Sequence, residues 1–364
     1  MKNPVDLNDT QKILANDPGK MLEALWNLPD QCERALAIGR GVKIPADYAS
    51  VSNIVITGLG GSAIGGDFLR LFVNDKLGIP VVVNRDYILP KFVNSQTLLF
   101  AVSYSGNTEE TLSAYSQARL QGARIVALTN GGKLKELAEK DGVPVIIVPA
   151  GISPRAATGY LLLPTLTVLE SLGLLGDLSD EIKEVTAVLR NLREQLRPDL
   201  PEGQNKAKQI ARKINGKIPV IWAASGNTEV IATRWKGQIN ENSKAPAYWN
   251  VFPELNHNEI VGLEEPVELL KKIEIIILRD KGDHPRVQKR MDISMEIVKD
   301  VVSGITEVWS SGDSRLARMF SLTYIGDYVS VYLAALYGID PTPVKNIDYL
   351  KNKLAEATPA GVAH

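Results

Sequence analysis

The chain has 364 residues, of which 45% are hydrophobic and 23% are charged, as is ordinary for a folded globular protein. Its 41 basic and 42 acidic residues give a formal net charge of −1, which argues against a protein that works by neutralising nucleic-acid phosphates. The single cysteine, Cys32, excludes an intramolecular disulfide, and with only three histidines the Cys/His zinc sites are excluded too. Any chemistry is therefore expected to depend mainly on carboxylates, lysine, arginine and hydroxyl groups.

The same features indicate where the protein works. The N-terminal residues have no apolar signal core, and the most apolar stretch, residues 161–178, is interrupted by Pro164, Glu170 and Asp177. A lone cysteine fits a reducing compartment. The sequence therefore predicts a cytoplasmic protein that does not interact with membranes or nucleic acid.

The first half of the chain predicts helices followed by a parallel sheet. Residues 1–40 are expected to be an N-terminal helical segment, and from residue 41 short continuous apolar runs predict strands buried on both faces. These runs cover residues 53–57, 81–83, 98–102, 125–128 and 145–148. Helices are expected at about 63–73, 108–120, 133–140 and 156–172. This alternation predicts a doubly wound α/β domain over residues 41–190.

The second half repeats this alternation after a charged, helical segment at 180–204, which is broken by Pro198 and Pro201 and where we expect the linker. Strands are predicted at 219–224, 273–278 and 306–309, and helices at 230–241, 285–301 and 315–336. This predicts a second α/β domain over 200–343, followed by a C-terminal helix and tail over 344–364. Residues 105–109, Ser-Gly-Asn-Thr-Glu, recur as 225–229, so two related α/β units are plausible, although a five-residue match can also arise by chance.

A glycine-rich segment, residues 58–66, follows the first predicted strand and opens a helix. Glycines allow a ligand to approach the backbone, and the helix N-terminus favours an anion. Gly58, Gly60 and Ala63 also fit the loose dinucleotide pattern, and Asp86 lies near the end of the next strand. A nicotinamide nucleotide and a tight turn without any ligand are therefore the two alternatives.

Three hydroxyl groups crowd the next helix start, and they favour a phosphate. Ser103, Ser105 and Thr108 follow the third predicted strand. A helix cap would explain one of these residues but not all three. Hydroxyls and backbone amides from two adjacent turns would hold a terminal phosphate.

Further residues offer positive charge and acid–base chemistry. Arg155 opens an apolar helix, which is unfavourable for a cation unless an anion is close, and a surface salt bridge is the alternative. Glu241 and His257 stand 16 residues apart at a helix end and in a loop. A glutamate and a histidine in one site can divide general base and general acid work, although each alone fits a solvated polar residue. His284 is expected to be a helix-start residue.

In their order along the chain, these motifs resemble the bifunctional phosphoglucose/phosphomannose isomerase family, which is built from two sugar isomerase (SIS) domains. The resemblance runs from about residue 21 to residue 354 and is carried by residues 60–62, 103–108, 154–155, 240–241 and 256–259. It implies two doubly wound, flavodoxin-like parallel-sheet domains and an isomerase of glucose 6-phosphate, and of mannose 6-phosphate, with fructose 6-phosphate. It also implies a homodimer that needs no cofactor and no metal ion.

The resemblance implies a role for each site residue. The substrate phosphate would be held by Gly60, Gly61, Ser62, Ser103, Ser105 and Thr108. Glu241 would move the proton between C1 and C2, and Arg155 would steady the enediolate. His257 would help to open the sugar ring, and the family can share this histidine across the subunit interface.

Two positions leave the resemblance less definite. The family has an active-site lysine near the C-terminus, and it corresponds to Lys351 or, as the alternative, to Lys353. Ser153 stands where relatives often have glutamine, so the sugar contacts of that loop stay open. A non-catalytic sugar-phosphate sensor is the main alternative to an enzyme, although such a sensor has no need of Glu241, His257 and a lysine together.

Overall fold

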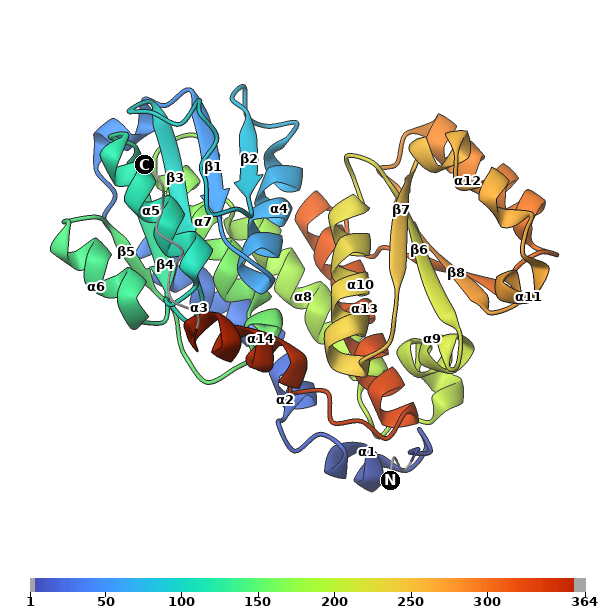
Figure 1. Cartoon of the computed structure of the whole chain (residues 1–364). Coiled ribbons are helices and arrows are strands. Elements are labelled where there is room, and N and C mark those ends of the chain that lie inside the picture. The colour runs from blue at the N-terminus through green and yellow to red at the C-terminus, as the bar shows by residue number, and fades with distance from the viewer. Residues whose placement is uncertain (1–3, 357–364) are drawn as a thin grey trace.

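The computed structural model describes residues 4–356 of the chain. Two parallel sheets, each covered by helices, stand side by side, and the first two N-terminal helices lie below them (Figure 1). The N-terminal segment forms three helices, α1 (Thr10–Ala15), α2 (Met21–Trp26) and α3 (Leu28–Arg40). This architecture confirms the predicted fold class of two doubly wound α/β units.

The first sheet has the strand order β2-β1-β3-β4-β5, and all its strands are parallel. Its strands are β1 (Asn53–Thr57), β2 (Val81–Asn84), β3 (Thr97–Val102), β4 (Arg124–Thr129) and β5 (Val145–Ile147). Every residue of β1 and β3 is buried, as the continuous apolar runs predict. Because the chain order reverses between β1 and β3, their carboxyl ends form the crevice where such sheets bind ligands.

Helices cover both faces of this sheet. The helices of the unit are α4 (Gly61–Val73), α5 (Glu109–Leu120), α6 (Gly132–Lys140) and α7 (Thr158–Ser171). Alternate strand residues divide between two cores: Val55 and Leu99 pack with α5 and α6, while Ile56 and Phe100 face α4 and α7. The period of two along each strand therefore gives each face its own apolar layer.

The second sheet has the order β7-β6-β8-β9, which is the arrangement of the first four strands of the first sheet. Its strands are β6 (Ile218–Ala224), β7 (Tyr248–Phe252), β8 (Ile273–Arg279) and β9 (Gly304–Trp309). Its helices are α9 (Lys206–Ile214), α10 (Glu229–Ser243), α11 (Val267–Leu270), α12 (Pro285–Val298) and α13 (Arg315–Leu336), and α8 (Ser179–Leu196) leads into the unit. The strand β7 and the helices α9 and α11 were not predicted.

The repeated Ser-Gly-Asn-Thr-Glu segment does not occupy equivalent places in the two units. It follows β3 in the first sheet but follows β6, the counterpart of β1, in the second. The shared strand order is therefore the better sign of two related units, and the five-residue echo does not mark matching positions.

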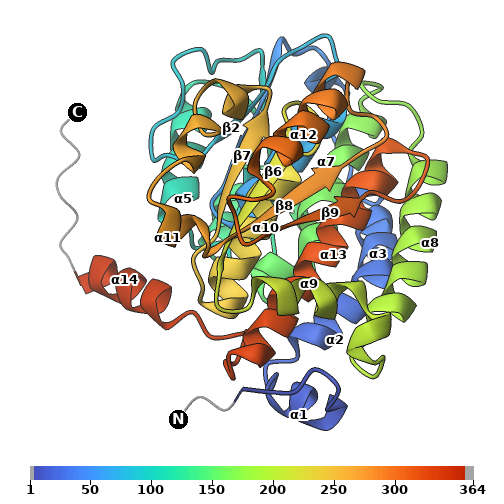
Figure 2. The same ribbon diagram turned by 90° about the vertical axis from the view of Figure 1, so that its right-hand side faces the viewer.

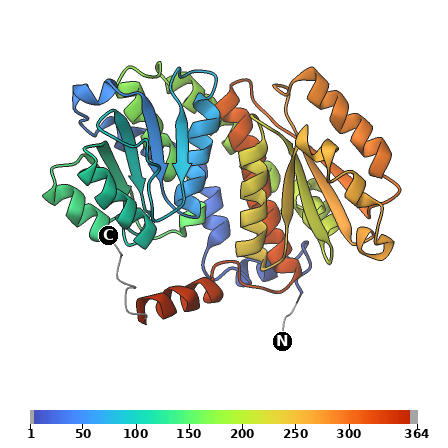
Figure 3. The same cartoon turned by 45° about the horizontal axis from the view of Figure 1, so that its top comes forward.

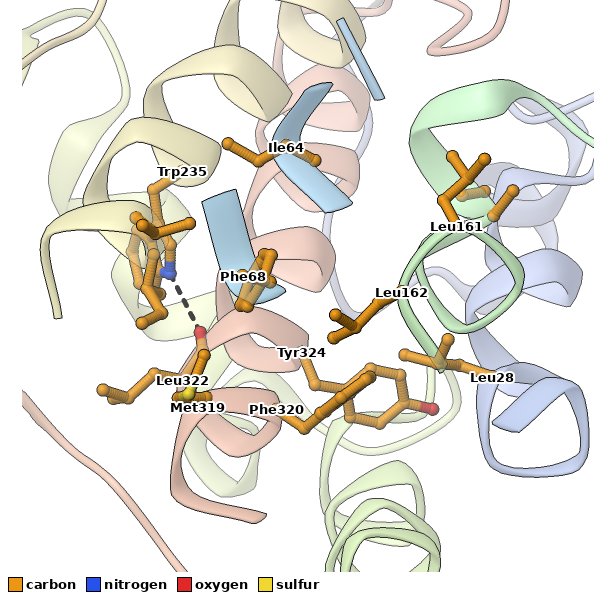
Figure 4. Close-up of a cluster of buried hydrophobic side chains, with 14 of the residues drawn as sticks. Leu28, Ile64, Phe68, Leu161, Leu162, Trp235, Met319, Phe320, Leu322 and Tyr324 are labelled. Carbon is orange, nitrogen blue, oxygen red and sulfur yellow. Dashed lines mark hydrogen bonds between the residues drawn. The ribbon is translucent and has the colours of Figure 1, made fainter. Parts of the chain in front are cut away.

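The helices between the two sheets form one apolar core centred on α13 (Figures 3 and 4). The rings of Phe68 on α4 and Phe320 on α13 lie 6.4 Å apart, and Trp235 on α10 donates from Nε1 to the carbonyl of Leu322 at 2.9 Å. Gly326 permits this approach, because a Cβ there would lie 2.2 Å from Trp235 Nε1. Helices from both units therefore share a single interior.

Within residues 4–356, one helix, α13, is long and apolar enough by length and composition to cross a membrane. All the residues of its apolar window are buried inside the protein, as is usual for the core helix of a globular fold.

The C-terminal helix α14 (Lys345–Glu356) stands apart from this core (Figure 2). Its apolar side chains are open to solvent, with Tyr349 66% and Leu350 57% exposed. The predicted helix at 344–354 is thus present, and the tail beyond residue 356 lies outside the described residues.

Candidate active site

The carboxyl ends of β1 and β3 bring three of the predicted hydroxyl groups to one crevice. Ser62, in the first turn of α4, accepts a hydrogen bond at Oγ from the amide of Tyr104 at 3.2 Å. The neighbouring Ser103 lies with its Oγ 2.9 Å from Oγ1 of Thr108. The two turns that the sequence predicts to be adjacent therefore do meet.

The hydroxyl of Thr108 is not used as a helix cap. Thr108 occupies the N-cap position of α5, but its side chain makes no capping hydrogen bond and instead contacts Ser103. Ser105 is exposed, and its Oγ accepts from the amide of Asn107 at 3.3 Å. The simple capping explanation therefore does not account for these side chains.

The glycine-rich turn joins this crevice to the segment that carries Arg155. Gly60 has a φ of +52° and precedes α4, which begins at Gly61 without a side-chain cap, and the positive end of the helix dipole there favours an anion. A Cβ on Gly61 would lie 2.7 Å from the carbonyl oxygen of Pro154. The glycine therefore allows the turn to pack directly on the backbone next to Arg155.

Arg155 is a buried residue, so the prediction of an exposed surface salt bridge is wrong. It lies in the short turn η2 (Pro154–Ala156), ahead of α7 and not at its first residue, with only 6% of its surface exposed. Its Nε donates to Asn242 Oδ1 at 2.7 Å, and its Nη2 donates to the carbonyls of Pro341 and Thr342 at 2.8 and 2.7 Å. Burial lowers the pKa of Arg155 below its ordinary value.

Glu241 faces this guanidinium from the last turn of α10. Its Oε2 accepts from Arg155 Nη1 at 3.5 Å, and one third of its side chain stays exposed. The two residues are 86 positions apart and come from different units, so the packing of α10 against η2 creates the pair. A carboxylate beside a fixed cation can take up a proton and have the resulting charge stabilised.

Lys244 is a second cation at this site that the sequence did not single out. It ends α10 in the left-handed region, at φ +55°, and its Nζ donates to the carbonyls of Glu241 and of Pro341, the latter at 2.9 Å. Burial, followed by the charge of Arg155, lowers its pKa to about 8. The only sequence signal was its place just after Glu241.

A cavity of about 760 Å³ opens beside Glu241 and Lys244. Its other walls come from the end of α10 and the residue after its cap, from the segment that links α13 to α14, and from the first turn of α14. They are Asn240, Ala245, Ile339, Asp340, Pro343, Val344, Lys345, Asn346 and Ile347. The cavity therefore lies directly beside Glu241, the carboxylate that pairs with Arg155.

Two predicted catalytic residues lie outside this arrangement within one chain. His257 is exposed at the end of the turn η4 (Glu254–His257), and its imidazole makes no hydrogen bond or ion pair with residues 4–356. Lys351 is exposed on α14 and likewise has no such partner in the described part of the chain, whereas Lys353 pairs with Glu356 at 2.5 Å. His284 caps α12 by accepting from the Arg286 amide at 3.1 Å, as predicted for a helix-start residue.

Two other predicted features take different roles. Asp86, the acidic residue of the dinucleotide alternative, accepts at Oδ1 from the amide of Tyr87 at 2.6 Å. Ser153 lines a separate cavity of about 390 Å³ together with Lys20, Gly151 and Ile152.

Comparisons with known proteins cover both units. Residues 47–173 match the model of the SIS domain, and residues 203–354 match that of the bacterial phospho-glucose isomerase C-terminal SIS domain. The chain is 57% identical over 336 residues to the bifunctional phosphoglucose/phosphomannose isomerase of Caldicellulosiruptor bescii, covering 92% of this chain and 99% of that protein. It is 40% identical over 314 residues to a protein of the same name from Aquifex aeolicus, covering 85% and 93%.

Solved structures agree in fold. A glucose-6-phosphate isomerase like protein from Thermus thermophilus superposes with a TM-score of 0.61 at 21% identity, covering 97% of this chain and 100% of that one.

Proposed function

The chain belongs to the bifunctional phosphoglucose/phosphomannose isomerase family, and we propose that it interconverts glucose 6-phosphate and mannose 6-phosphate with fructose 6-phosphate. The observation that carries this proposal is the contact of Arg155 with Glu241 beside a cavity, next to a glycine-rich turn and a group of hydroxyls at the start of two helices. This combination supplies a phosphate-binding site, a general base and a positive charge in a fixed position.

The phosphate is bound at the ends of β1 and β3, where Ser62, Ser103, Ser105 and Thr108 offer hydroxyl groups. A group that does not react still contributes binding energy, which holds the sugar so that C1 and C2 meet the catalytic groups. Because Gly61 packs against Pro154, the bound phosphate and Arg155 keep a set separation.

The proton transfer is assigned to Glu241. Its carboxylate removes the proton from C2 of the open-chain aldose, and the electrons move into the C1 carbonyl to form an enediolate. A proton then passes from the C2 hydroxyl to the C1 oxygen, and the proton held by Glu241 is returned at C1 as the C2 carbonyl of the ketose forms. Arg155 Nη1 faces this carboxylate and stabilises the charge that develops on the enediolate oxygen. Glucose and mannose differ at C2, and the enediolate erases that difference, which allows one site to serve both.

Ring opening is assigned to His257, which does not lie beside Glu241 within one chain, and the protein is proposed to be a homodimer. His257 acts on the ring oxygen in this scheme, and its exposed position away from Glu241 is consistent with a homodimer in which a second copy presents it. The exposed apolar face of α14 also supports association. The cytoplasm is the proposed compartment.

The decisive experiment measures turnover of fructose 6-phosphate with separate detection of glucose 6-phosphate and mannose 6-phosphate. We expect both products to form without added cofactor, and both reverse reactions to proceed. Binding of fructose 6-phosphate by calorimetry without any turnover would instead establish the non-catalytic sensor. Saturable binding of a nicotinamide nucleotide, followed by fluorescence, would favour the dinucleotide alternative at the Gly58 loop.

A further inference from the structure

The guanidinium of Arg155 is held so that a single nitrogen is left for the reacting groups. Its Nε is bonded to Asn242 and its Nη2 to two backbone carbonyls, all at 2.7–2.8 Å. Its Nη1 has a long contact, to Glu241 at 3.5 Å. The planar, five-donor geometry of arginine means that fixing Nε and Nη2 also fixes the direction of Nη1.

Asn242 is the side chain that holds Nε, and it is itself held from the core. It is fully buried, and its Nδ2 donates to Ser330 Oγ on α13 at 2.9 Å. Ser330 Oγ in turn donates to the carbonyl of Asp327 at 2.6 Å. This chain of bonds determines which end of the Asn242 amide faces the arginine, because Ser330 takes the amide nitrogen and leaves the oxygen for Nε.

A second set of bonds from α13 fixes the backbone of Arg155. Arg234 on α10 pairs with Asp327 through Nε and Nη2, at 3.0 and 2.8 Å, and the same Nη2 donates to the Arg155 carbonyl at 2.7 Å. Gln238 donates to Asp327 as well, at 2.8 Å. Both ends of Arg155 are therefore tied to the buried helix α13.

We propose that Asn242 is a positioning residue for the isomerisation, which acts by orienting Arg155 so that Nη1 alone faces the enediolate. This inference rests on the function proposed above. The charge of Arg155 can be satisfied by neutral oxygen atoms, as it is here, or by a close ion pair with Glu241. A close ion pair would make both the base and the stabilising cation unavailable to the substrate. The bond from Asn242 keeps the guanidinium out of that contact and available for the charge that forms in the reaction.

The test compares Asn242→Ala with Ser243→Ala, its neighbour on α10. Ser243 is also buried and also bonds to Ser330, through Oγ to the Ser330 carbonyl at 2.6 Å, but it makes no hydrogen bond to Arg155. Both variants lose a buried bond between α10 and α13, so a purely structural effect would be shared. Thermal unfolding of each variant measures that shared part.

We expect Asn242→Ala to lower kcat by about 10–100-fold, in the range for loss of oriented charge stabilisation, with KM for fructose 6-phosphate changed by less than about 3-fold. Ser243→Ala should keep kcat within about 2-fold of the wild type. Ser330→Ala, which frees the Asn242 amide without removing it, should fall between the two.

A second readout is independent of turnover. A phosphorylated aldonic acid, whose carboxylate mimics the enediolate, should bind Asn242→Ala about 10–100-fold more weakly than the wild type, while fructose 6-phosphate binds equally. Equal losses of kcat in the alanine variants of Asn242 and Ser243, or unchanged affinity for the mimic, would overturn the inference. Failure of the proposed function is a different result: the wild type itself would then not isomerise fructose 6-phosphate.

Discussion

The segment Ser-Gly-Asn-Thr-Glu occurs in both units, but its glutamate points away from the turn in the first unit and folds back onto the turn in the second. In the first unit Glu109 is exposed and accepts from the hydroxyl of Tyr87 at 3.3 Å, so it does not fold onto its own turn, where the Gly106 amide donates to Ser103 Oγ at 3.1 Å instead. In the second unit Glu229 folds back onto its own turn and accepts from the Gly226 amide at 2.9 Å and from Ser225 Oγ at 3.3 Å. The second turn is therefore already occupied by a carboxylate of the protein.

The neighbouring strand end reinforces this contrast. The end of β8 carries two buried carboxylates, Asp280 and Asp283, and Asn227 donates to both at 3.1 and 2.7 Å. The crevice of the first unit is lined by hydroxyls and glycines, while that of the second is lined by acids. The same short sequence therefore has different surroundings in the two units. We propose that only the first of them binds the substrate phosphate, while the second unit contributes Glu241 at the far end of α10.

The largest expected effect on turnover comes from replacing Glu241, the residue that the second unit contributes. Glu241→Gln removes the base and leaves the phosphate crevice intact, so kcat should fall about 10²–10⁴-fold or more while substrate affinity hardly changes. Steady-state kinetics and calorimetry with fructose 6-phosphate measure the two quantities. Retention of a tenth of the wild-type kcat would remove Glu241 from the mechanism.

The next test compares the two turns directly. The double variant Ser105→Ala, Thr108→Ala should lose about 3–6 kcal/mol of binding to the sugar phosphate, because each hydrogen bond to a charged phosphate contributes roughly 1.5–3 kcal/mol. Inhibition by inorganic phosphate should weaken in parallel.

The matched control is Ser225→Ala, Thr228→Ala in the second turn. Thr228 Oγ1 accepts from the Ala224 amide at 2.8 Å, so this control should cost stability but leave KM unchanged. Equal changes in KM in both double variants would mean that the two turns do not differ in phosphate binding.

Gly61→Ala should have a smaller effect that tests how the first turn is joined to Arg155. The new Cβ would lie 2.7 Å from the Pro154 carbonyl, so α4 or η2 must shift. We expect kcat/KM to fall about 10-fold and the free energy of unfolding to fall by about 1–3 kcal/mol. Gly78→Ala is the control, since nothing lies within 4 Å of a Cβ there among the described residues; similar kinetics for both variants would argue against the link.

The smallest expected effect is on stability alone. Burial works to raise the pKa of Glu229, but the bonds from Gly226 and Arg70 outweigh it and hold that pKa below its ordinary value of 4.5. The charged form thus stabilises the fold above pH 4.5, and this contribution is lost as the pH falls through the folded-state pKa. Glu229→Gln should lower the unfolding free energy by about 1–2 kcal/mol at pH 7 and by much less in acid.

Glu109→Gln is the matched control for that measurement, because Glu109 is exposed and its bond is to the Tyr87 hydroxyl, not to a loop amide. Its unfolding free energy should equal that of the wild type at both pH values. A Glu229→Gln difference that is independent of pH would contradict the internal-anion explanation.

Most of the fold was predictable because buried parallel strands give unmistakable apolar runs. The strand β7 was missed since it lies at a sheet edge, where Tyr248 is 58% and Trp249 39% exposed, so its run is neither continuous nor cleanly alternating. The helix α9 was missed although Ala207, Ile210, Ala211 and Ile214 recur at helical spacing and are buried, because it is short and directly follows the segment interpreted as the linker.

The candidate site was predictable only in part, because some of its contacts follow from strand order and others depend on how the two units pack. The meeting of Ser62 with Ser103 follows from the rule for strand ends, which needs only the order of the strands. The contact of Arg155 with Glu241 depends on how two units pack, and no local pattern encodes that. Asn242 and Lys244 follow closely after Glu241 in the sequence, but their hydrogen-bond partners on other elements give them their roles.

The close packing of Gly61 on Pro154 has a consequence for which sugars fit. The phosphate crevice and the base are joined by backbone contact at one end and by the bonds of Arg155 to Asn242 at the other, so the span between them is fixed. If the phosphate and the base lie where we propose, this fixed span selects for chain length: a hexose 6-phosphate bound by its phosphate would bring C1 and C2 to Glu241, and a pentose 5-phosphate bound in the same way would be one carbon too short. Chain-length selection would then reside in the scaffold, and changes in the loop that touches the sugar would leave it intact.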